Sequence, residues 1–375
     1  MSVAREQGAL AIRSGYDFID VTRALAAFLV VVSHTQQMII DRPLSPGAVH
    51  RALSMMTTQG HNAVVVFFVI SGFWIVRSVL RAGEAFSFGD YMLARGTRLW
   101  VVLLPALVLG GGLDLLGSTV FPSPLYAGTQ GSVSLTQDVL TRLSAPVFLG
   151  NLLFLQDIAV PPLGSNGALW TIACEFWYYV YFPLALLALR SRNVLWIVVA
   201  AGGLFLLPNL HLFACWMLGG VVHVLADRGK PGRSLHWALP AAALGLFGLA
   251  VVLLKLFPVN WIANDLLLAS VFALFLGLGL RSSFGEARGL GRLARFGSRS
   301  SYSLYATHLP LVVFLCNFLV PTARIPASPL AWALVLAIPA VAVAFAVLFS
   351  RLTEDRTAAA RKWASGVLKP SPGVS

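Results

Sequence analysis

Charged side chains are scarce in this sequence of 375 residues, because Asp, Glu, Lys and Arg together make up only 11% of it. An ordinary soluble domain is about 25% charged. Hydrophobic residues make up 58% of the chain, and 15 acids with 27 bases cannot cover the surface of a soluble protein of this length. The composition excludes a soluble enzyme and a disordered chain, and it indicates a polytopic membrane protein.

Cysteine is nearly absent as well. Cys174, Cys215 and Cys316 all lie in apolar stretches, and no C-x-x-C pair occurs. This pattern excludes a disulfide-stapled secreted module and favours three thiols that pack as small hydrophobic residues. We expect no metal site.

Ten apolar segments approach the length of about 20 residues that a membrane-spanning helix needs. They are residues 18–39, 61–80, 99–120, 167–189, 193–208, 211–226, 237–257, 261–280, 301–320 and 329–350. The fifth and sixth segments are short and share the break at Pro208 and Asn209, so residues 193–226 form either two full spans or a re-entrant pair. The sequence predicts an all-α polytopic membrane protein with about ten transmembrane helices.

The expected organisation is a cytoplasmic N-terminus over residues 1–17, a transmembrane domain over 18–350 and a cytoplasmic tail over 351–375. Residues 369–375 are rich in Pro, Ser and Gly and predict a frayed end. The first apolar segment is too long for the core of a signal peptide and has no cleavage site, so we interpret it as a retained span.

The positive charges give the orientation, because Lys and Arg concentrate in cytoplasmic loops. With both termini inside, five of the 27 basic residues fall outside and the other 22 lie on or near the cytoplasmic side. The five outside are Arg42, Arg51, Arg142, Lys255 and Arg324. The net charge of +12 is therefore a topology signal and does not predict nucleic-acid binding.

Ionisable residues within spans are costly and usually functional. The first span carries Asp20, Arg23 and His34. At 100° per residue, the 11 positions from Arg23 to His34 turn the helix by about 1100°, close to three full turns. The three side chains therefore form one polar stripe, in which Asp20 and Arg23 can pair. The stripe is either a functional surface or a helix interface that holds the bundle together.

The second and fourth spans carry polar residues near mid-depth. Ser71 and Gly72 lie in the second span, where Gly72 favours close helix packing and Ser71 can donate a hydrogen bond. Glu175 lies eight or nine residues into the fourth span, too deep for an interfacial aromatic belt. A carboxylate there must be protonated, paired or hydrated. Tyr178, three residues later, shares its helix face.

The third and ninth spans add groups near their cytoplasmic ends. Arg95 and Arg98 stand three residues apart where the third span opens, a spacing suited to a phosphate or to ordinary cytoplasmic anchoring. Tyr302 lies at the start of the ninth span. His308 follows deeper in, ahead of Pro310, which frees a backbone carbonyl.

Four other polar residues lie in or near spans. Asp114 falls within the third span. His211, His223 and Asp265 lie near span ends, where we expect solvation at the membrane interface.

Five motifs, taken in order, resemble the acyltransferase-3 family of integral-membrane acyltransferases. They are VTRALAAFLVVVSH, FFVISGFW, Arg95-x-x-Arg98, NGALWTIACEFWYYVYFP and SYSLYATHLP, and the resemblance covers about residues 16–350. The family implies a ten-helix domain with both ends cytoplasmic in the bacterial inner membrane. Its members move an acyl group, often acetyl, from cytoplasmic acyl-CoA to hydroxyls of cell-envelope or secreted glycans, and some acylate small molecules.

The resemblance also implies site residues. His34 matches the essential first-helix histidine of the family, Arg23 and Asp20 match its D-x-x-R, and Glu175 matches the acid of its fourth-span pattern. Arg95 and Arg98 match the pair thought to hold coenzyme A phosphates. The fourth-span pattern shows two departures, since Thr171-Ile172 replaces Ser-Leu and Cys174 replaces an acid that is common there.

These residues predict an acyl-CoA-dependent O-acyltransferase, with acetyl-CoA the expected donor and a carbohydrate or glycolipid the acceptor. His34 is the expected general base, Glu175 an acid that orients or polarises the acceptor or the histidine, and Ser71 or Tyr178 an oxyanion donor. Asp20 is a further expected catalytic residue. Arg23, Arg95, Arg98, Tyr302 and His308 are expected to bind the donor. A covalent acyl-enzyme relay remains an alternative to direct transfer.

Two other classes of protein fit part of the pattern. A transporter of a glycan or small molecule can use Asp, Arg, Glu and His as a proton relay, but no internal repeat is visible. A scaffold subunit would have a dry interior. The sequence leaves open the acceptor, the acyl chain length and the oligomeric state.

Overall fold

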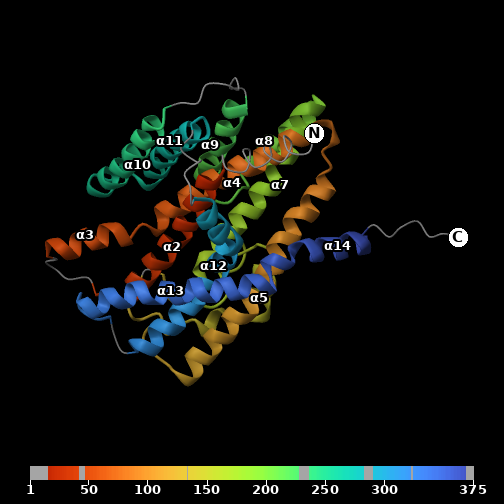
Figure 1. Cartoon of the computed structure of the whole chain (residues 1–375). Helices are drawn as coiled ribbons and strands as arrows, with labels where there is room; N and C mark the ends of the chain where they lie inside the picture. Colours follow the sequence, from red (N-terminus) through yellow and green to blue (C-terminus); the bar gives the residue numbers. More distant parts are fainter. Residues whose placement is uncertain are drawn as a thin grey trace. The chain divides into compact units, whose positions relative to one another are not determined.

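A computed structural model describes residues 16–41, 47–132, 134–227, 236–282, 290–321 and 324–368 (Figure 1). Side chains at 290, 292, 293, 295, 296 and 298 fall outside the described part. The α-helices are α2 Asp17–Ile39, α3 Ala48–Thr57, α4 Gly60–Ala82, α5 Phe88–Val120, α6 Ala145–Leu152, α7 Trp170–Ser191, α8 Val194–Leu204, α9 Leu210–Asp227, α10 Ala238–Leu256, α11 Trp261–Leu280, α12 Leu290–Leu319, α13 Pro329–Leu352 and α14 Thr357–Leu368. Within the described ranges, four short 3₁₀ helices are η1 Gly83–Ala85, η2 Leu140–Arg142, η3 Gly167–Leu169 and η5 Glu354–Arg356.

The described ranges hold no β-strand, which confirms the all-α prediction. Nine helical segments in these ranges are long and apolar enough to cross a membrane. The fifth predicted span, residues 193–208, corresponds to α8, whose 11 residues extend only about 16 Å at 1.5 Å per residue. This is about half the hydrocarbon thickness, so α8 is a short apolar helix and α9 forms the full-length segment after it.

The chain divides into two compact units. The first comprises residues 1–26, 61–86 and 204–298, and the second comprises residues 27–60, 87–203 and 299–375. The helices α2 and α12 each contribute to both units. The two units are described separately below.

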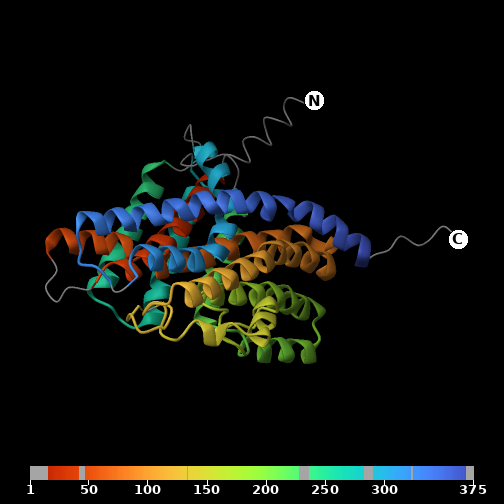
Figure 2. The same cartoon turned by 90° about the horizontal axis from the view of Figure 1, so that it is seen from below.

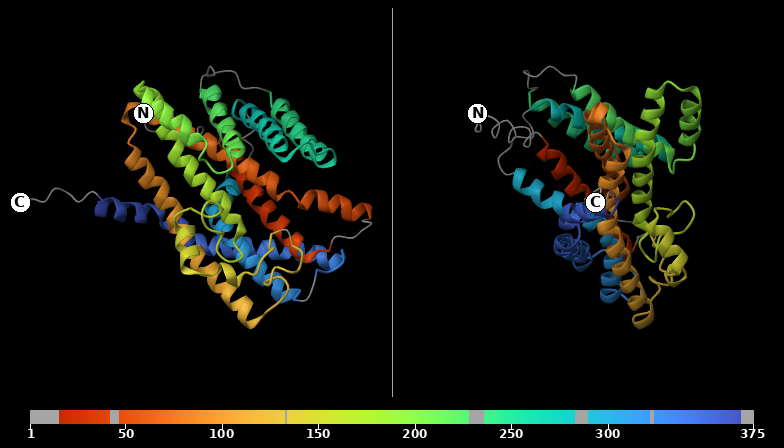
Figure 3. Two further views of the ribbon diagram at one scale, coloured as in Figure 1. Left: turned by 180° about the vertical axis from the view of Figure 1, so that it is seen from behind. Right: turned by 90° about the vertical axis from the view of Figure 1, so that its right-hand side faces the viewer.

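In the first unit, α11 packs against both α9 and α10 (Figures 1 and 3). Glycine brings α9 into backbone contact with α4. A Cβ on Gly219 would lie 1.8 Å from the carbonyl oxygen of Val69, and one on Gly72 would lie 1.8 Å from that of Trp216. The close helix packing expected at Gly72 is therefore confirmed.

We expect Gly219→Ala to destabilise the protein, because the added methyl group forces α4 and α9 apart. Overpacking of this kind costs about 1–3 kcal/mol. Thermal unfolding of the purified protein in one detergent measures the change. Gly245→Ala on α10 is the matched control, since its added Cβ meets no atom within 4 Å. An equal effect of both substitutions would contradict the helix contact.

In the second unit, α5 packs against α6, α7 and α14 (Figure 2). The helix begins at Phe88, where the Ser87 hydroxyl accepts the backbone N–H of Asp90 at 3.3 Å. It therefore begins well before residue 99, the predicted start. Arg95 and Arg98 lie in its second and third turns, beyond the first turn where the helix dipole acts.

The predicted tail contains ordered structure. Within residues 351–375, η5 and α14 follow α13, and α14 packs along α5. The predicted frayed end at 369–375 lies outside the described residues.

Candidate active site

His34 lies on α2 in the second unit, and its side chain is partly exposed. Its Nδ1 lies 2.9 Å from the Ser134 hydroxyl. Its ring lies 5.4 Å, centroid to centroid, from the ring of His308 on α12. The structure thus brings two of the predicted site residues together and adds a serine that the sequence did not indicate.

His308 is fully buried, and its two ring nitrogens differ. Nδ1 lies 2.7 Å from the carbonyl oxygen of Tyr305, which can only accept a hydrogen bond, so Nδ1 carries the proton. In the neutral ring Nε2 is then an acceptor, and among the described residues it has no hydrogen-bond partner. A buried acceptor without a partner indicates a place for a donor from water or a substrate.

A chain of hydroxyl groups links α12 to the start of α7. The Thr171 hydroxyl donates to Tyr305 Oη at 2.7 Å, and the Tyr305 hydroxyl donates to the Ala168 carbonyl at 3.3 Å. Thr171 stands where the family resemblance expects serine. Its hydroxyl supplies a hydrogen bond that serine could also make, so this departure preserves the local chemistry.

Glu175 lies one turn beyond Thr171 and is partly exposed. The Tyr179 hydroxyl donates a hydrogen bond to its carboxylate. The sequence pointed to Tyr178, which is fully buried and whose role stays a prediction. Tyr179 is a functional candidate that the sequence did not single out, although its position four residues after Glu175 places it on the same helix face.

Pro310 shapes the contact between α12 and the segment that links α5 to α7, residues 121–169, which we call the α5–α7 segment. Proline has no N–H, so the carbonyl of Ala306, four residues earlier, loses its usual helical partner. The Asn166 amide donates to this carbonyl at 2.9 Å. The predicted free carbonyl therefore holds the end of the α5–α7 segment next to His308.

Asp114 on α5 holds the same part of the segment. Its carboxylate is fully buried and accepts the backbone N–H of Ser165 at 2.7 Å. Gly164 has φ +56°, and a Cβ there would lie 2.1 Å from Asp114 Oδ2, so only glycine fits. Burial, with this neighbouring carboxylate, raises the pKa of the Tyr126 phenol, which stays protonated.

The predicted donor-binding residues of the second unit lie on α5 and α12. Arg98 is exposed, and no carboxylate of the described residues forms a salt bridge with it. The Arg95 guanidinium lies 5.7 Å from the centre of the Tyr91 ring. The Tyr302 hydroxyl donates to the Leu99 carbonyl at 3.2 Å, which ties α12 to α5 beside Arg98.

Asp20, Arg23 and Ser71 belong to the first unit. The predicted pair is confirmed, since Arg23 Nη2 lies 3.0 Å from Asp20 Oδ1. Ser71 Oγ accepts a hydrogen bond from Trp216 Nε1 at 3.3 Å. The pairing with Asp20 neutralises part of the Arg23 charge, and the proposed roles of the three residues in catalysis stay predictions.

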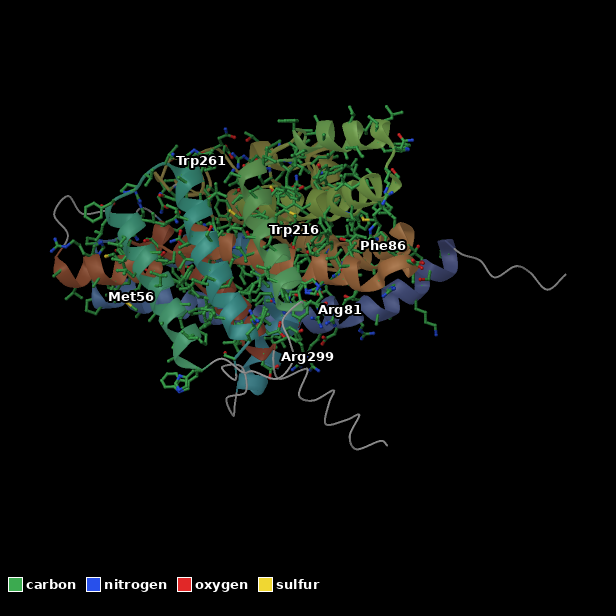
Figure 4. All side chains as sticks on the ribbon, turned by 90° about the horizontal axis from the view of Figure 1, so that it is seen from above. Met56, Arg81, Phe86, Trp216, Trp261 and Arg299 are labelled. Atoms are coloured by element: carbon green, nitrogen blue, oxygen red, sulfur yellow. The ribbon has the colours of Figure 1, made fainter. Side chains whose placement is uncertain are left out.

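The expectation of interfacial solvation for His211, His223 and Asp265 is wrong, because His223 and Asp265 are buried in the first unit and the His211 side chain is only 8% exposed. Asp265 lies between two imidazoles, with Oδ1 2.8 Å from His61 Nε2 and Oδ2 3.3 Å from His211 Nε2. The ring of His211 meets that of Trp261 edge-on at 4.5 Å. Trp261 is the first residue of α11 and is labelled in Figure 4. Pairing across three helices allows the carboxylate to be buried.

The fold and the site define a multi-pass membrane protein. It carries a pair of imidazoles, His34 and His308, and a separate pair of arginines, Arg95 and Arg98. The acyltransferase domain family matches residues 16–349, and the chain belongs to this acyltransferase-3 family. The family resemblance in the sequence motifs is thereby confirmed.

A curated relative supports the assignment. The chain is 25% identical over 185 residues to an O-acetyl transferase of Shigella phage Sf6, which covers 48% of this chain. The match spans about half the length of that relative, 49%. No solved structure is significantly similar to the chain.

Proposed function

We propose that this protein is a membrane O-acyltransferase that moves an acyl group, acetyl in the first instance, from acyl-CoA to a hydroxyl of a cell-envelope or secreted glycan in a bacterial inner membrane. One observation carries the proposal: His34 on α2 lies against His308 on α12, and the buried Nε2 of His308 has no hydrogen-bond partner among the described residues. Membership of the acyltransferase family and the O-acetyl transferase relative support this assignment.

The proposed reaction needs one base that takes the proton of the hydroxyl group to be acylated. His34 takes the proton of the acceptor hydroxyl while the hydroxyl oxygen attacks the thioester carbonyl carbon. The carbon–sulfur bond then breaks, and His34 returns the proton to the coenzyme A sulfur. The products are the ester and free coenzyme A, so atoms and charge balance.

The surrounding residues have supporting roles in this proposal. His308 accepts a hydrogen bond from the acyl donor through Nε2, which has no partner in the described part of the chain, while Glu175 orients the acceptor. Arg95 and Arg98 bind the coenzyme A phosphates, because guanidinium groups form strong charge-assisted hydrogen bonds with phosphate oxygens. Tyr178 stabilises the oxyanion, and the role expected of Ser71 stays a prediction.

The test uses purified protein in lipid nanodiscs with radiolabelled acetyl-CoA and glycans isolated from the producing cells. We expect saturable coenzyme A binding, acceptor-dependent release of free thiol, and alkali-labile label on the glycan. A transporter would carry a glycan or small molecule across the bilayer without any need of coenzyme A. Absence of both coenzyme A binding and thiol release would overturn the proposed function.

A further inference from the structure

Ser134 lies in the α5–α7 segment, 100 positions from His34 in the chain, and its hydroxyl contacts His34 Nδ1 at 2.9 Å. The same hydroxyl contacts the Gln37 side chain on α2, with Ser134 Oγ 3.0 Å from Gln37 Oε1. Ser134 therefore lies between two side chains of one helix that are separated by a single turn. The proposed reaction assigns no role to Ser134 or Gln37.

The direction of each hydrogen bond follows from the chemistry of the groups. The amide oxygen of Gln37 can only accept, so the single hydroxyl proton of Ser134 is donated to it. In the structure the Gln37 amide nitrogen donates to Ser33 Oγ at 3.3 Å, and the amide oxygen faces the Ser134 hydroxyl. With its proton committed to Gln37, Ser134 presents a lone pair to His34.

The lone pair of Ser134 decides which nitrogen of His34 carries the proton. A neutral imidazole has one N–H and one acceptor nitrogen. Nδ1–H donates to Ser134, so Nε2 carries the lone pair and can take a proton from a substrate. The opposite tautomer would place an N–H at Nε2, where it cannot act as a base.

We propose that Ser134 and Gln37 are positioning residues that hold His34 in the Nδ1–H tautomer, and thereby make Nε2 the base for the acceptor hydroxyl. The role of Nε2 rests on the proposed function, whereas the tautomer does not. Because Ser134 belongs to the α5–α7 segment, the position of this segment determines which tautomer His34 adopts. Removing a hydrogen-bond partner that orients a metal-bound histidine commonly lowers activity by about ten- to hundredfold, and we expect an effect of this size for His34.

The first measurement is the ¹⁵N spectrum of His34 in histidine-labelled protein in nanodiscs, with the signal assigned from its loss in His34→Asn. We expect the signature of a proton on Nδ1 in the wild type, and a mixture of tautomers in Ser134→Ala. A wild-type proton on Nε2, or an unchanged spectrum in Ser134→Ala, would overturn the proposal.

The second measurement is acetyl transfer kinetics. Ser134→Ala should lower kcat by about ten- to hundredfold and leave KM for acetyl-CoA unchanged, while Ser134→Thr keeps a hydroxyl and should restore most of kcat. Gln37→Met removes the amide oxygen that accepts the Ser134 proton, so it should resemble Ser134→Ala in both measurements. It gives a second test if Ser134→Ala folds poorly. Ser144→Ala, an exposed serine in the same segment, is the matched control.

The outcomes separate this inference from the proposed function. Wild-type protein that transfers no acetyl group would contradict the function, and the ¹⁵N spectrum would still decide the tautomer. Wild-type transfer with equal kcat in Ser134→Ala and Ser144→Ala would retain the function and overturn the positioning role. A rise in KM without a change in kcat would likewise overturn it, because that result means weaker donor binding.

Discussion

Replacing His34 by asparagine is expected to lower kcat for acetyl transfer by about a hundred- to ten-thousandfold, the usual contribution of a general base. Asparagine keeps an N–H donor near the position of Nδ1, so the contact with Ser134 can persist, but it has no basic nitrogen. The loss should therefore fall on kcat and leave coenzyme A binding intact. The measurement is the initial rate of thiol release at saturating acetyl-CoA.

The matched control is His236→Gln, which also replaces an imidazole by an amide but at an exposed position ahead of α10. It should retain full activity. The unfolding midpoint of His34→Asn should stay close to that of the wild type, since the side chain is partly exposed and its hydrogen-bond donor is preserved. Full activity in a folded His34→Asn protein would remove His34 from the mechanism.

The helices could be predicted from the sequence because apolar length is a local property. Predicted spans 18–39 and 261–280 match α2 and α11 within one residue. Polar residues account for the larger differences between the predicted and the observed helix starts. The starts of α5 and α12 contain Asp90 and several arginines, so hydropathy placed both helices to begin later than they do. Apolar length also overestimated α8, which ends before Pro208.

The candidate site could be predicted only where its residues are unusual for their surroundings. His34 and His308 stood out as ionisable groups in apolar spans, and the structure places their rings together. Ser134 had no such signal, because serine in a polar loop is ordinary and its contact spans 100 positions. The structure was needed to show that this loop reaches His34.

Burial also changes the interpretation of charged residues near span ends. Asp265 was expected to be solvated because of its position in the sequence, but it is buried between His61 and His211. Its partners lie on two other helices, so only the packing of α4, α9 and α11 reveals them. Asp114 is comparable, since its carboxylate serves the backbone of Ser165 rather than a neighbouring side chain.

Arg98→Ala is expected to raise KM for acetyl-CoA by roughly ten- to hundredfold, since a charge-assisted hydrogen bond contributes about 1.5–3 kcal/mol. The Arg98 side chain is exposed and forms no salt bridge within the described residues, so a phosphate would not have to displace a carboxylate. Because the phosphates lie far from the reacting carbonyl, binding is lost equally from ground and transition states. kcat should therefore change little.

A donor analogue can identify the phosphate that Arg98 binds. Acetyl-dephospho-CoA lacks the ribose phosphate, and it should lose affinity for the wild type. If Arg98 binds that phosphate, the analogue and Arg98→Ala should show less than additive losses, as expected of two changes that remove one interaction. Additive losses would instead assign Arg98 to the pyrophosphate.

Arg190→Ala is the matched control for charge, because Arg190 is an exposed arginine at the end of α7 that the topology also places on the cytoplasmic side. An equal rise in KM for both variants would mean that general attraction to a basic surface, and not a phosphate site on α5, accounts for donor binding. An unchanged KM in Arg98→Ala would exclude Arg98 from the donor site. A rise confined to Arg98→Ala would place the donor phosphates on the third-turn face of α5, next to the Tyr302 contact that joins α5 to the helix carrying His308.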